Sequence, residues 1–150
     1  MKKSKILITG GAGLIGSQVV EDLNSQGKSD IIICDHLGTT EKWKNLRRNS
    51  FFDYLEKTEL RNKMDSSDSF FDEFSHIIHL GACSATTEKD ATYLIANNYN
   101  FTKDLAHIAV RKKIPFIYAS SAATYGDGEF GYDDSLPLDS LRPMNMYGYS

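Results

Sequence analysis

The sequence lacks the features that mark secreted or membrane-bound proteins. Two cysteines among 150 residues give no disulfide framework. The apolar run behind the basic N-terminus covers only Ile6 to Ile8 before glycines follow, which is too short for a signal peptide. No stretch approaches the roughly 20 apolar residues of a membrane span. We therefore expect a cytoplasmic protein with no membrane partner.

An excess of positive charge is absent as well. The net charge is -3, and the lysines and arginines are dispersed rather than gathered into a stripe, so no nucleic-acid partner is expected. A hydrophobic content of 41% with 25% charged residues is typical of a globular domain that buries a sizeable core. No repeat, low-complexity tract or linker interrupts it, and we expect one domain over residues 1–150.

What the sequence does contain is an alternation of short apolar runs with helical patterns. The runs predict strands at residues 5–9, 30–34, 50–55, 76–80 and 115–120. Helical spacing predicts helices over 14–26 and about 87–111, with helical pieces around a polar turn between 56 and 74. This order predicts an α/β fold with a Rossmann-type, doubly wound parallel sheet, whose ligands bind beyond the C-terminal ends of the strands.

The turn behind the first predicted strand carries Gly10, Gly13 and Gly16. Glycines at such a turn allow a tight bend, a close approach of the backbone to a pyrophosphate, and packing of the helix on the strand. An ordinary turn is the alternative. Because a strand precedes the turn and an amphipathic helix follows it, the pattern predicts dinucleotide binding.

The second predicted strand ends next to Asp35, which lies 19 residues after Gly16. A carboxylate there can accept hydrogen bonds from the adenosine ribose and favours NAD, because it would repel a 2′-phosphate. Lys42 and Lys57 would reverse that preference if they supplied positive charge at the same place. The alternative is that both are solvated surface lysines.

Two later segments bear on catalysis. Ser121 follows the fifth predicted strand, where its hydroxyl would hold a substrate oxygen beside the nicotinamide; a serine-rich turn is the alternative. Tyr147 comes soon after Pro143, a residue typical of a helix start. The loop between residues 126 and 143 is either part of a substrate cleft or a surface connection. A metal site at His76 and His79 is not expected, because residues three apart on a strand face opposite sides.

These residues together resemble the extended short-chain dehydrogenase/reductase superfamily, and within it the ADP-L-glycero-D-manno-heptose 6-epimerases. The resemblance runs over essentially the whole chain. The segments that carry it are Asp35 to Leu37 with Lys42, Asp53-Tyr54 with Lys57, Gly81 to Glu88, Asn97 to Tyr99, Ser120 to Gly126 and Tyr147 to Ser150. The run from Gly81 to Glu88 discriminates most.

The resemblance implies a tightly held NADP, with NAD as the alternative. The cofactor-binding residues that it implies, together with the glycines of the turn, are Gly10, Gly13, Leu14, Ile15, Gly16, Asp35, His36, Lys42, Lys57, Leu80, Gly81, Ala82, Cys83, Ser84, Asn97 and Tyr147. In this group Lys42 and Lys57 would face the 2′-phosphate. The position of His36 is commonly asparagine in the family.

The implied reaction inverts C6 of the heptose of an ADP-heptose substrate through a transient ketone, for the core of lipopolysaccharide. Ser121 would orient the oxygen and Tyr147 would act as acid and base, Tyr149 being the competing tyrosine. A phenol has a reference pKa near ~10, and family members lower it with a lysine four residues later, here position 151, beyond Ser150.

We therefore expect a substrate lobe outside these residues, an inactive 150-residue chain, and a homo-oligomer for the full-length protein. The alternatives are another sugar-nucleotide epimerase or dehydratase of the superfamily, and a non-catalytic dinucleotide-binding module.

Overall fold

The computed structural model describes residues 4–150, which divide into two compact units. The first unit contains residues 4–81 and Thr102–Tyr118, and the second contains Ala82–Phe101 and Ala119–Ser150. Among the described residues, no helix is both long and apolar enough to cross a bilayer.

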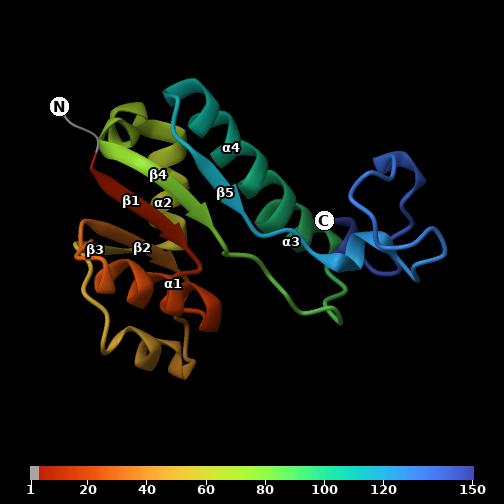
Figure 1. Ribbon diagram of the computed structural model, residues 1–150, viewed down its shortest axis with the longest axis horizontal. Coiled ribbons are helices and arrows are strands. Elements are labelled where there is room, and N and C mark those ends of the chain that lie inside the picture. The colour runs from red at the N-terminus through yellow and green to blue at the C-terminus, as the bar shows by residue number, and fades with distance from the viewer. Residues whose placement is uncertain (1–3) are drawn as a thin grey trace. The chain divides into compact units, whose positions relative to one another are not determined.

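The first unit is built on one parallel sheet of five strands (Figure 1). The strands are β1 (Lys5–Thr9), β2 (Ile31–Asp35), β3 (Asp53–Glu56), β4 (Phe74–His79) and β5 (Phe116–Tyr118), in the order β3-β2-β1-β4-β5. The chain moves outward from β1 to β3 and then returns to the other side of β1. The sheet order therefore reverses between β1 and β4, which is where doubly wound folds bind their ligands. The predicted fold class is confirmed.

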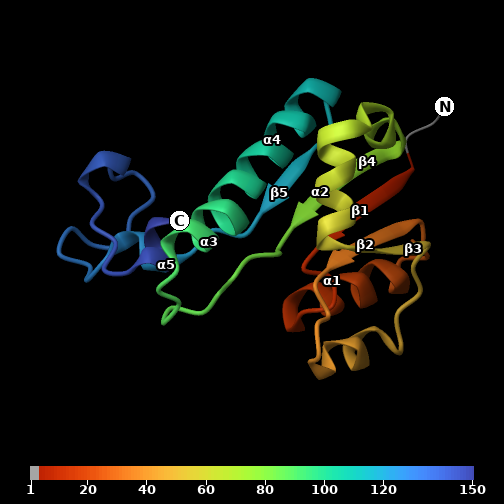
Figure 2. The same ribbon diagram turned by 180° about the vertical axis from the view of Figure 1, so that it is seen from behind.

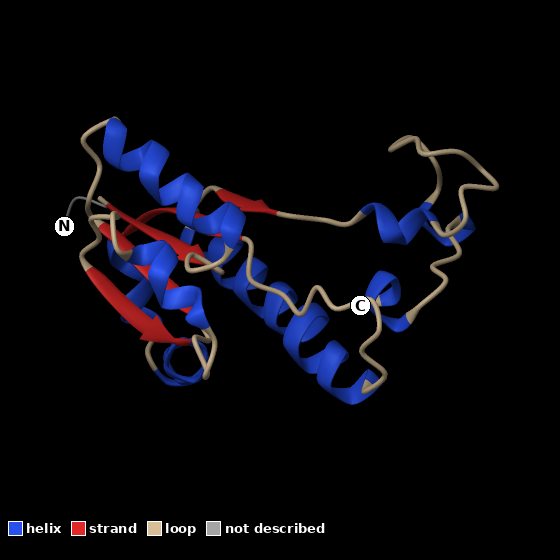
Figure 3. Cartoon of the chain, turned by 90° about the horizontal axis from the view of Figure 1, so that it is seen from below, coloured by secondary structure: helices blue, strands red, loops and turns tan. Residues whose placement is uncertain are grey.

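Helices cover both faces of this sheet. Helix α1 (Leu14–Ser25) lies on one face, and α2 (Lys57–Ser66) lies on the other together with α4 (Phe101–Lys112) from Thr102 onward (Figures 2 and 3). Two short 3-10 helices, η1 (Glu41–Leu46) and η2 (Asp68–Glu73), complete the connections. Two-sided cover explains why the central strands β1 and β2 are nearly continuous buried runs rather than alternating ones.

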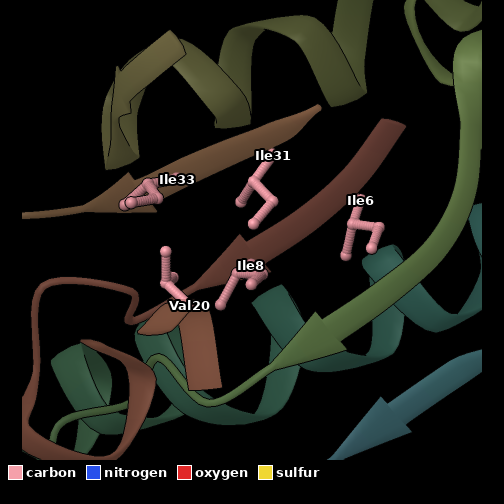
Figure 4. Packing of buried hydrophobic residues seen from close by; sticks show 5 residues of the cluster. All are labelled: Ile6, Ile8, Val20, Ile31 and Ile33. Atoms are coloured by element: carbon pink, nitrogen blue, oxygen red, sulfur yellow. The ribbon is translucent and has the colours of Figure 1, made fainter. Parts of the chain in front are cut away.

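The core on the α1 side consists of isoleucines from the two central strands. Ile6 and Ile8 of β1 lie beside Ile31 and Ile33 of β2, and Val20 of α1 packs on them (Figure 4). All five side chains are buried. Each contributes about 1.5–3 kcal/mol of burial free energy, so this cluster fixes the register of β1 against β2.

The second unit consists of short helices and turns. Its elements are α3 (Ala91–Leu94), the π-helical segment η3 (Ile95–Asn100), the 3-10 helices η4 (Ala122–Tyr125) and η5 (Leu138–Ser140), and α5 (Met146–Tyr149).

The boundaries of β2 to β5 differ from the prediction by one to three residues, and among the strand starts those of β3 and β4 differ most, for local reasons. β3 begins at Asp53 rather than at residue 50, because the backbone of Ser50 is bound by a side chain instead of a strand. The side-chain amide of Asn24 accepts the N–H of Ser50 at 2.7 Å and donates to the carbonyl of Ser50 at 2.8 Å. β4 begins two residues early, at Phe74, because this ring is buried and its backbone pairs with Lys5 of β1.

Two helix starts were also predicted wrongly. The helix expected from about residue 87 begins at Ala91, because the carboxylate of Asp90 accepts the N–H of Tyr93 and caps it. The helix expected at Pro143 begins at Met146, where the Asn145 side chain accepts the N–H of Gly148 at 2.8 Å.

Candidate dinucleotide site and catalytic segment

The turn between β1 and α1 admits only glycine at two positions. Gly10 has a φ of +69°, in the left-handed region. A Cβ on Gly16 would lie 2.1 Å from the carbonyl oxygen of Gly10, so the first turn of the helix rests directly on the loop backbone. The N–H of Gly13 donates to the same carbonyl at 2.9 Å. The predicted glycine triplet therefore forms one closed turn.

The start of α1 is suited to an anion. Gly13 stands at the N-cap, no side chain caps the helix, and its first turn carries no acidic residue. The amides at a helix start carry partial positive charge and seek an acceptor. Leu14 and Ile15, at the same end, are 84% and 68% exposed. The turn thus fits the pyrophosphate of a dinucleotide, with two apolar side chains beside it.

Asp35 ties the end of β2 to this turn. Its buried carboxylate accepts the N–H of Ala12 at 2.9 Å and the N–H of His36 at 2.7 Å. The ammonium group of Lys42 lies 2.5 Å from the same carboxylate. Lys42 therefore neutralises Asp35, and the two predicted residues form a pair rather than separate charges.

A second carboxylate lies beside Asp35 in the sheet register. Glu56 pairs with Asp35 across β2 and β3, and its Oε1 lies 2.9 Å from Nδ1 of His36. The hydroxyl of Tyr54 donates to the carbonyl of Asp35 at 2.9 Å. Burial and the Glu56 charge raise the pKa of the Tyr54 phenol above its ordinary value, so it stays a donor. Lys57 follows as the first residue of α2. Sequence reasoning missed Glu56, whose place follows only from the register.

The end of β4 meets the glycine turn through backbone contact. A Cβ on Gly10 would lie 2.7 Å from the amide nitrogen of Gly81, and the Gly81 N–H donates to Thr9 Oγ1 at 3.1 Å. His79 is buried, whereas His76 is exposed, and the two pair with β1 positions on opposite faces as expected. Among residues 4–150, no three His, Cys, Asp or Glu side chains gather as metal ligands.

In the second unit, Asn98 organises the backbone of Cys83. The buried Asn98 side chain accepts the Cys83 N–H at 2.8 Å and donates to the Cys83 carbonyl at 3.1 Å and to Ser150 Oγ at 3.1 Å. Ala82 and Ser84, on either side of Cys83, are exposed. Asn97 was predicted as the functional asparagine, and its amide donates to Asn98 at 3.0 Å. The π-helical turn that carries both is an irregularity common at functional sites, but it leaves no mark in the sequence.

Ser121 and Tyr147, the predicted catalytic pair, lie on two elements that pack together. Ser121 caps η4, and its Oγ accepts the N–H of Ala123 at 3.2 Å. Tyr147 is half-buried in α5, where a Cβ on the adjacent Gly148 would lie only 2.6 Å from the Ala123 carbonyl oxygen. Tyr149 is 70% exposed. The second unit therefore brings the Ser121 and Tyr147 segments side by side.

Residues 6–150 match the family described as the NAD dependent epimerase/dehydratase family. The chain belongs to this family.

Curated relatives narrow the comparison within the NAD dependent epimerase/dehydratase family. The chain is 47% identical over 148 residues to the ADP-L-glycero-D-manno-heptose-6-epimerase of Fusobacterium nucleatum, covering 97% of this chain and 44% of that protein. It is 45% identical over 145 residues to the enzyme of the same name from Nitratidesulfovibrio vulgaris, covering 96% and 45%. The chain thus spans just under half the length of these relatives.

Solved structures of the family have the same fold. The ADP-L-glycero-D-manno-heptose-6-epimerase of Helicobacter pylori superposes with a TM-score of 0.74 at 26% identity, over 99% of this chain and 48% of that one. The UDP-glucuronic acid 4-epimerase of Bacillus cereus, in complex with UDP-glucuronic acid and NAD, gives a TM-score of 0.79 at 25% identity, over 97% and 48%. The family match and the NAD-bound neighbour together support a nicotinamide dinucleotide as the cofactor.

Proposed function

We propose that the whole protein to which this chain belongs is an NADP-dependent epimerase that inverts C6 of the heptose in ADP-D-glycero-D-manno-heptose. The observation that carries the substrate is the identity of 45–47% to two enzymes of that name. The closed glycine turn before an uncapped helix supports the dinucleotide. The product would enter the core of lipopolysaccharide, and the reaction would take place in the cytoplasm in a homo-oligomer.

The preference for NADP over NAD rests on the Asp35–Lys42 pair. An uncompensated carboxylate at the end of β2 would repel a 2′-phosphate. Lys42 lies 2.5 Å from Asp35 and neutralises it, and Lys57 begins the helix that follows β3. In the proposal, Lys42 and Lys57 contact the 2′-phosphate, while Asp35 chiefly holds the glycine turn.

Ser121 and Tyr147 would handle the proton of the reacting hydroxyl. When bound, the nicotinamide would supply reversible hydride transfer at C6 of the sugar, to either face of that carbon. Tyr147 takes the hydroxyl proton as the hydride leaves, which yields a ketone, and gives the proton back when the hydride returns. Ser121 donates a hydrogen bond to the substrate oxygen in both half-reactions. The sequence is redox-neutral overall, and only the configuration at C6 changes.

The test uses the protein expressed from the complete reading frame. It is incubated with ADP-D-glycero-D-manno-heptose, and the configuration at C6 is followed by NMR. We expect the L-glycero epimer to accumulate to an equilibrium mixture without added reductant. Absence of that epimer, with correctly folded and dinucleotide-loaded protein, would overturn the proposal.

A sugar-nucleotide 4-epimerase is the second candidate, and the TM-score of 0.79 to the Bacillus cereus UDP-glucuronic acid 4-epimerase favours it. The same assay with UDP-glucuronic acid separates the two, since inversion at C4 of that sugar would select the second candidate. The third candidate is a non-catalytic dinucleotide-binding module. Binding of NADPH by the whole protein without turnover of either substrate would select it.

A further inference from the structure

A buried histidine links three elements at the point where the sheet order reverses. The imidazole of His79, at the end of β4, lies between two threonine hydroxyls. Its Nδ1 is 2.5 Å from Oγ1 of Thr9, the last residue of β1, and its Nε2 is 2.8 Å from Oγ1 of Thr102 in α4. Neither the glycine turn nor the predicted catalytic pair explains this arrangement.

The Thr9 end of this arrangement reaches both loops that are proposed to bind the dinucleotide. Thr9 directly precedes Gly10, and its Oγ1 accepts the N–H of Gly81 at 3.1 Å. Gly10 and Gly81 are in backbone contact, because a Cβ on Gly81 would lie 2.9 Å from the Gly10 nitrogen and 3.1 Å from Thr9 Oγ1. A displacement of Gly81 is therefore transmitted directly to the first glycine of the turn.

The hydrogen bonds define how the proton is placed. Since Thr9 Oγ1 accepts from Gly81, its own proton is free to be donated to Nδ1 of His79. A neutral imidazole with an accepting Nδ1 carries its proton on Nε2, where Thr102 Oγ1 is the acceptor. Burial lowers the pKa of His79 to about 4, so the ring is neutral near pH 7. Each group therefore donates to the next: the N–H of Gly81 to the Thr9 hydroxyl, the Thr9 hydroxyl to Nδ1 of His79, and the Nε2–H of His79 to the Thr102 hydroxyl.

We propose that His79 is a positioning residue for dinucleotide binding: as the Nε2–H tautomer, it orients the Thr9 hydroxyl and so holds Gly81 and the glycine turn together. This inference rests on the proposed function, since it assigns His79 to the same dinucleotide site. It adds a residue that does not touch the cofactor.

Two substitutions of His79 distinguish a role in positioning the dinucleotide site from a role in the stability of the fold. In His79→Asn the side-chain amide replaces Nδ1 and keeps the bond to Thr9, whereas in His79→Gln it replaces Nε2 and keeps the bond to Thr102. Each variant removes one hydrogen bond of the imidazole, that of the buried Thr9 in His79→Gln and that of the half-buried Thr102 in His79→Asn, so the unfolding free energy of each variant is measured beside its Kd. We expect the Kd for NADPH to rise about 10-fold in His79→Gln and less than about 3-fold in His79→Asn.

A second pair covers the case in which a His79 variant does not fold. Thr9→Val removes the hydroxyl and keeps the shape, and it should raise the Kd for NADPH about 10-fold. Thr9→Ser restores the hydroxyl and should restore binding. Ile108→Ala serves as the stability control: Ile108 is buried and lies six residues along α4 from Thr102, so the substitution should destabilise the fold while the Kd stays at the wild-type value.

The tautomer is measured directly by two-bond ¹H–¹⁵N NMR of the imidazole in the 150-residue chain and in the whole protein. An Nε2–H form at pH 7 is expected, and an Nδ1–H or charged ring would overturn the inference. Equal Kd values for Thr9→Val and wild type would also overturn it, while leaving the proposed function intact. A wild-type whole protein that binds neither NADPH nor NADH would overturn both.

Discussion

The two units hold their candidate residues by different means. In the first unit the candidates stand at the ends of buried strands, and Asp35 is fixed by the backbone of the glycine turn and by Lys42. In the second unit the candidates lie in short helices and turns that are held by side-chain caps, such as Ser121 on η4 and Asn145 on α5. The geometry proposed to bind the cofactor in the first unit is thus formed as the core folds, whereas the geometry proposed for catalysis depends on a few local polar bonds. Substitutions at the glycine turn of the first unit should therefore change binding and stability together, and those of Ser121 and Tyr147 in the second unit should chiefly change turnover.

The largest effect is expected in the second unit, from Tyr147→Phe in the whole protein. Removing the phenolic proton carrier should lower turnover by about 10²–10⁴-fold, because no second acid or base is assigned to the C6 hydroxyl. The matched control is Tyr149→Phe, since Tyr149 lies two residues away and is 70% exposed. Steady-state rates measure the turnover of both variants, and thermal unfolding checks that both are folded. Comparable rates for the two variants would remove Tyr147 from the mechanism.

The next effect is expected in the first unit, from Gly16→Ala. The new methyl group would lie 2.1 Å from the Gly10 carbonyl oxygen, so the helix must move off the turn. We expect a loss of about 3 kcal/mol in unfolding free energy and a rise of about 100-fold in the Kd for NADPH. Denaturant titration measures the loss of stability, and NADPH fluorescence measures the change in Kd.

Gly27→Ala is the control for that change. Gly27 follows the end of α1 with a φ of +75° and has no atom within 4 Å of its Cβ position, so the substitution strains the backbone without a clash. It should cost about 1–2 kcal/mol of stability and leave NADPH affinity unchanged. If Gly16→Ala bound NADPH as Gly27→Ala does, the turn would not be the pyrophosphate site.

The contrast between the units also explains what could be predicted from the sequence. The central strands β1 and β2 are short, rich in isoleucine and bounded by turn residues, so they and the glycine turn follow from composition and spacing. The edge strand β3 was placed too early because a tertiary contact, from Asn24 to Ser50, decides where it begins.

Most of what was missed depends on partners distant in the sequence. Glu56 becomes part of the site only because β3 pairs with β2 in the register that sets it beside Asp35. Asn98 and its neighbour Asn97 are alike in the sequence, and only the π-helical turn directs Asn98 toward Cys83. Pro143 was a reasonable helix start by local preference, but Asn145 supplies the actual cap.

The burial of His79 predicts a pH dependence of stability in the first unit. Its pKa is about 4 in the folded chain against an ordinary value of 6.5, so the unfolded chain gains a proton first as the pH falls. The stability that His79 contributes is therefore complete above pH 6.5 and is lost between pH 6.5 and about 4. The loss should approach about 3 kcal/mol at the lower end. Unfolding free energies of wild type and His79→Gln, measured from pH 7 to pH 4, test this, and parallel profiles would contradict it.

The smallest effect is expected at the exposed rim of the first unit, from Lys42→Ala. This change removes a cation proposed to contact the 2′-phosphate and leaves the buried charge of Asp35 uncompensated. The Kd for NADPH should therefore rise about 10-fold relative to that for NADH, a change of about 1.4 kcal/mol. Lys44→Ala is the matched control, because Lys44 belongs to the same 3-10 helix but pairs with Glu41. The ratio of the two Kd values, measured in low salt and again in high salt, decides the matter. Because salt screens a coulombic contact, the preference for NADPH should weaken with salt in the wild type and in Lys44→Ala. In Lys42→Ala that preference should depend less on salt. If the ratio of Kd values in Lys42→Ala equalled that of the wild type, other residues would determine the choice of cofactor.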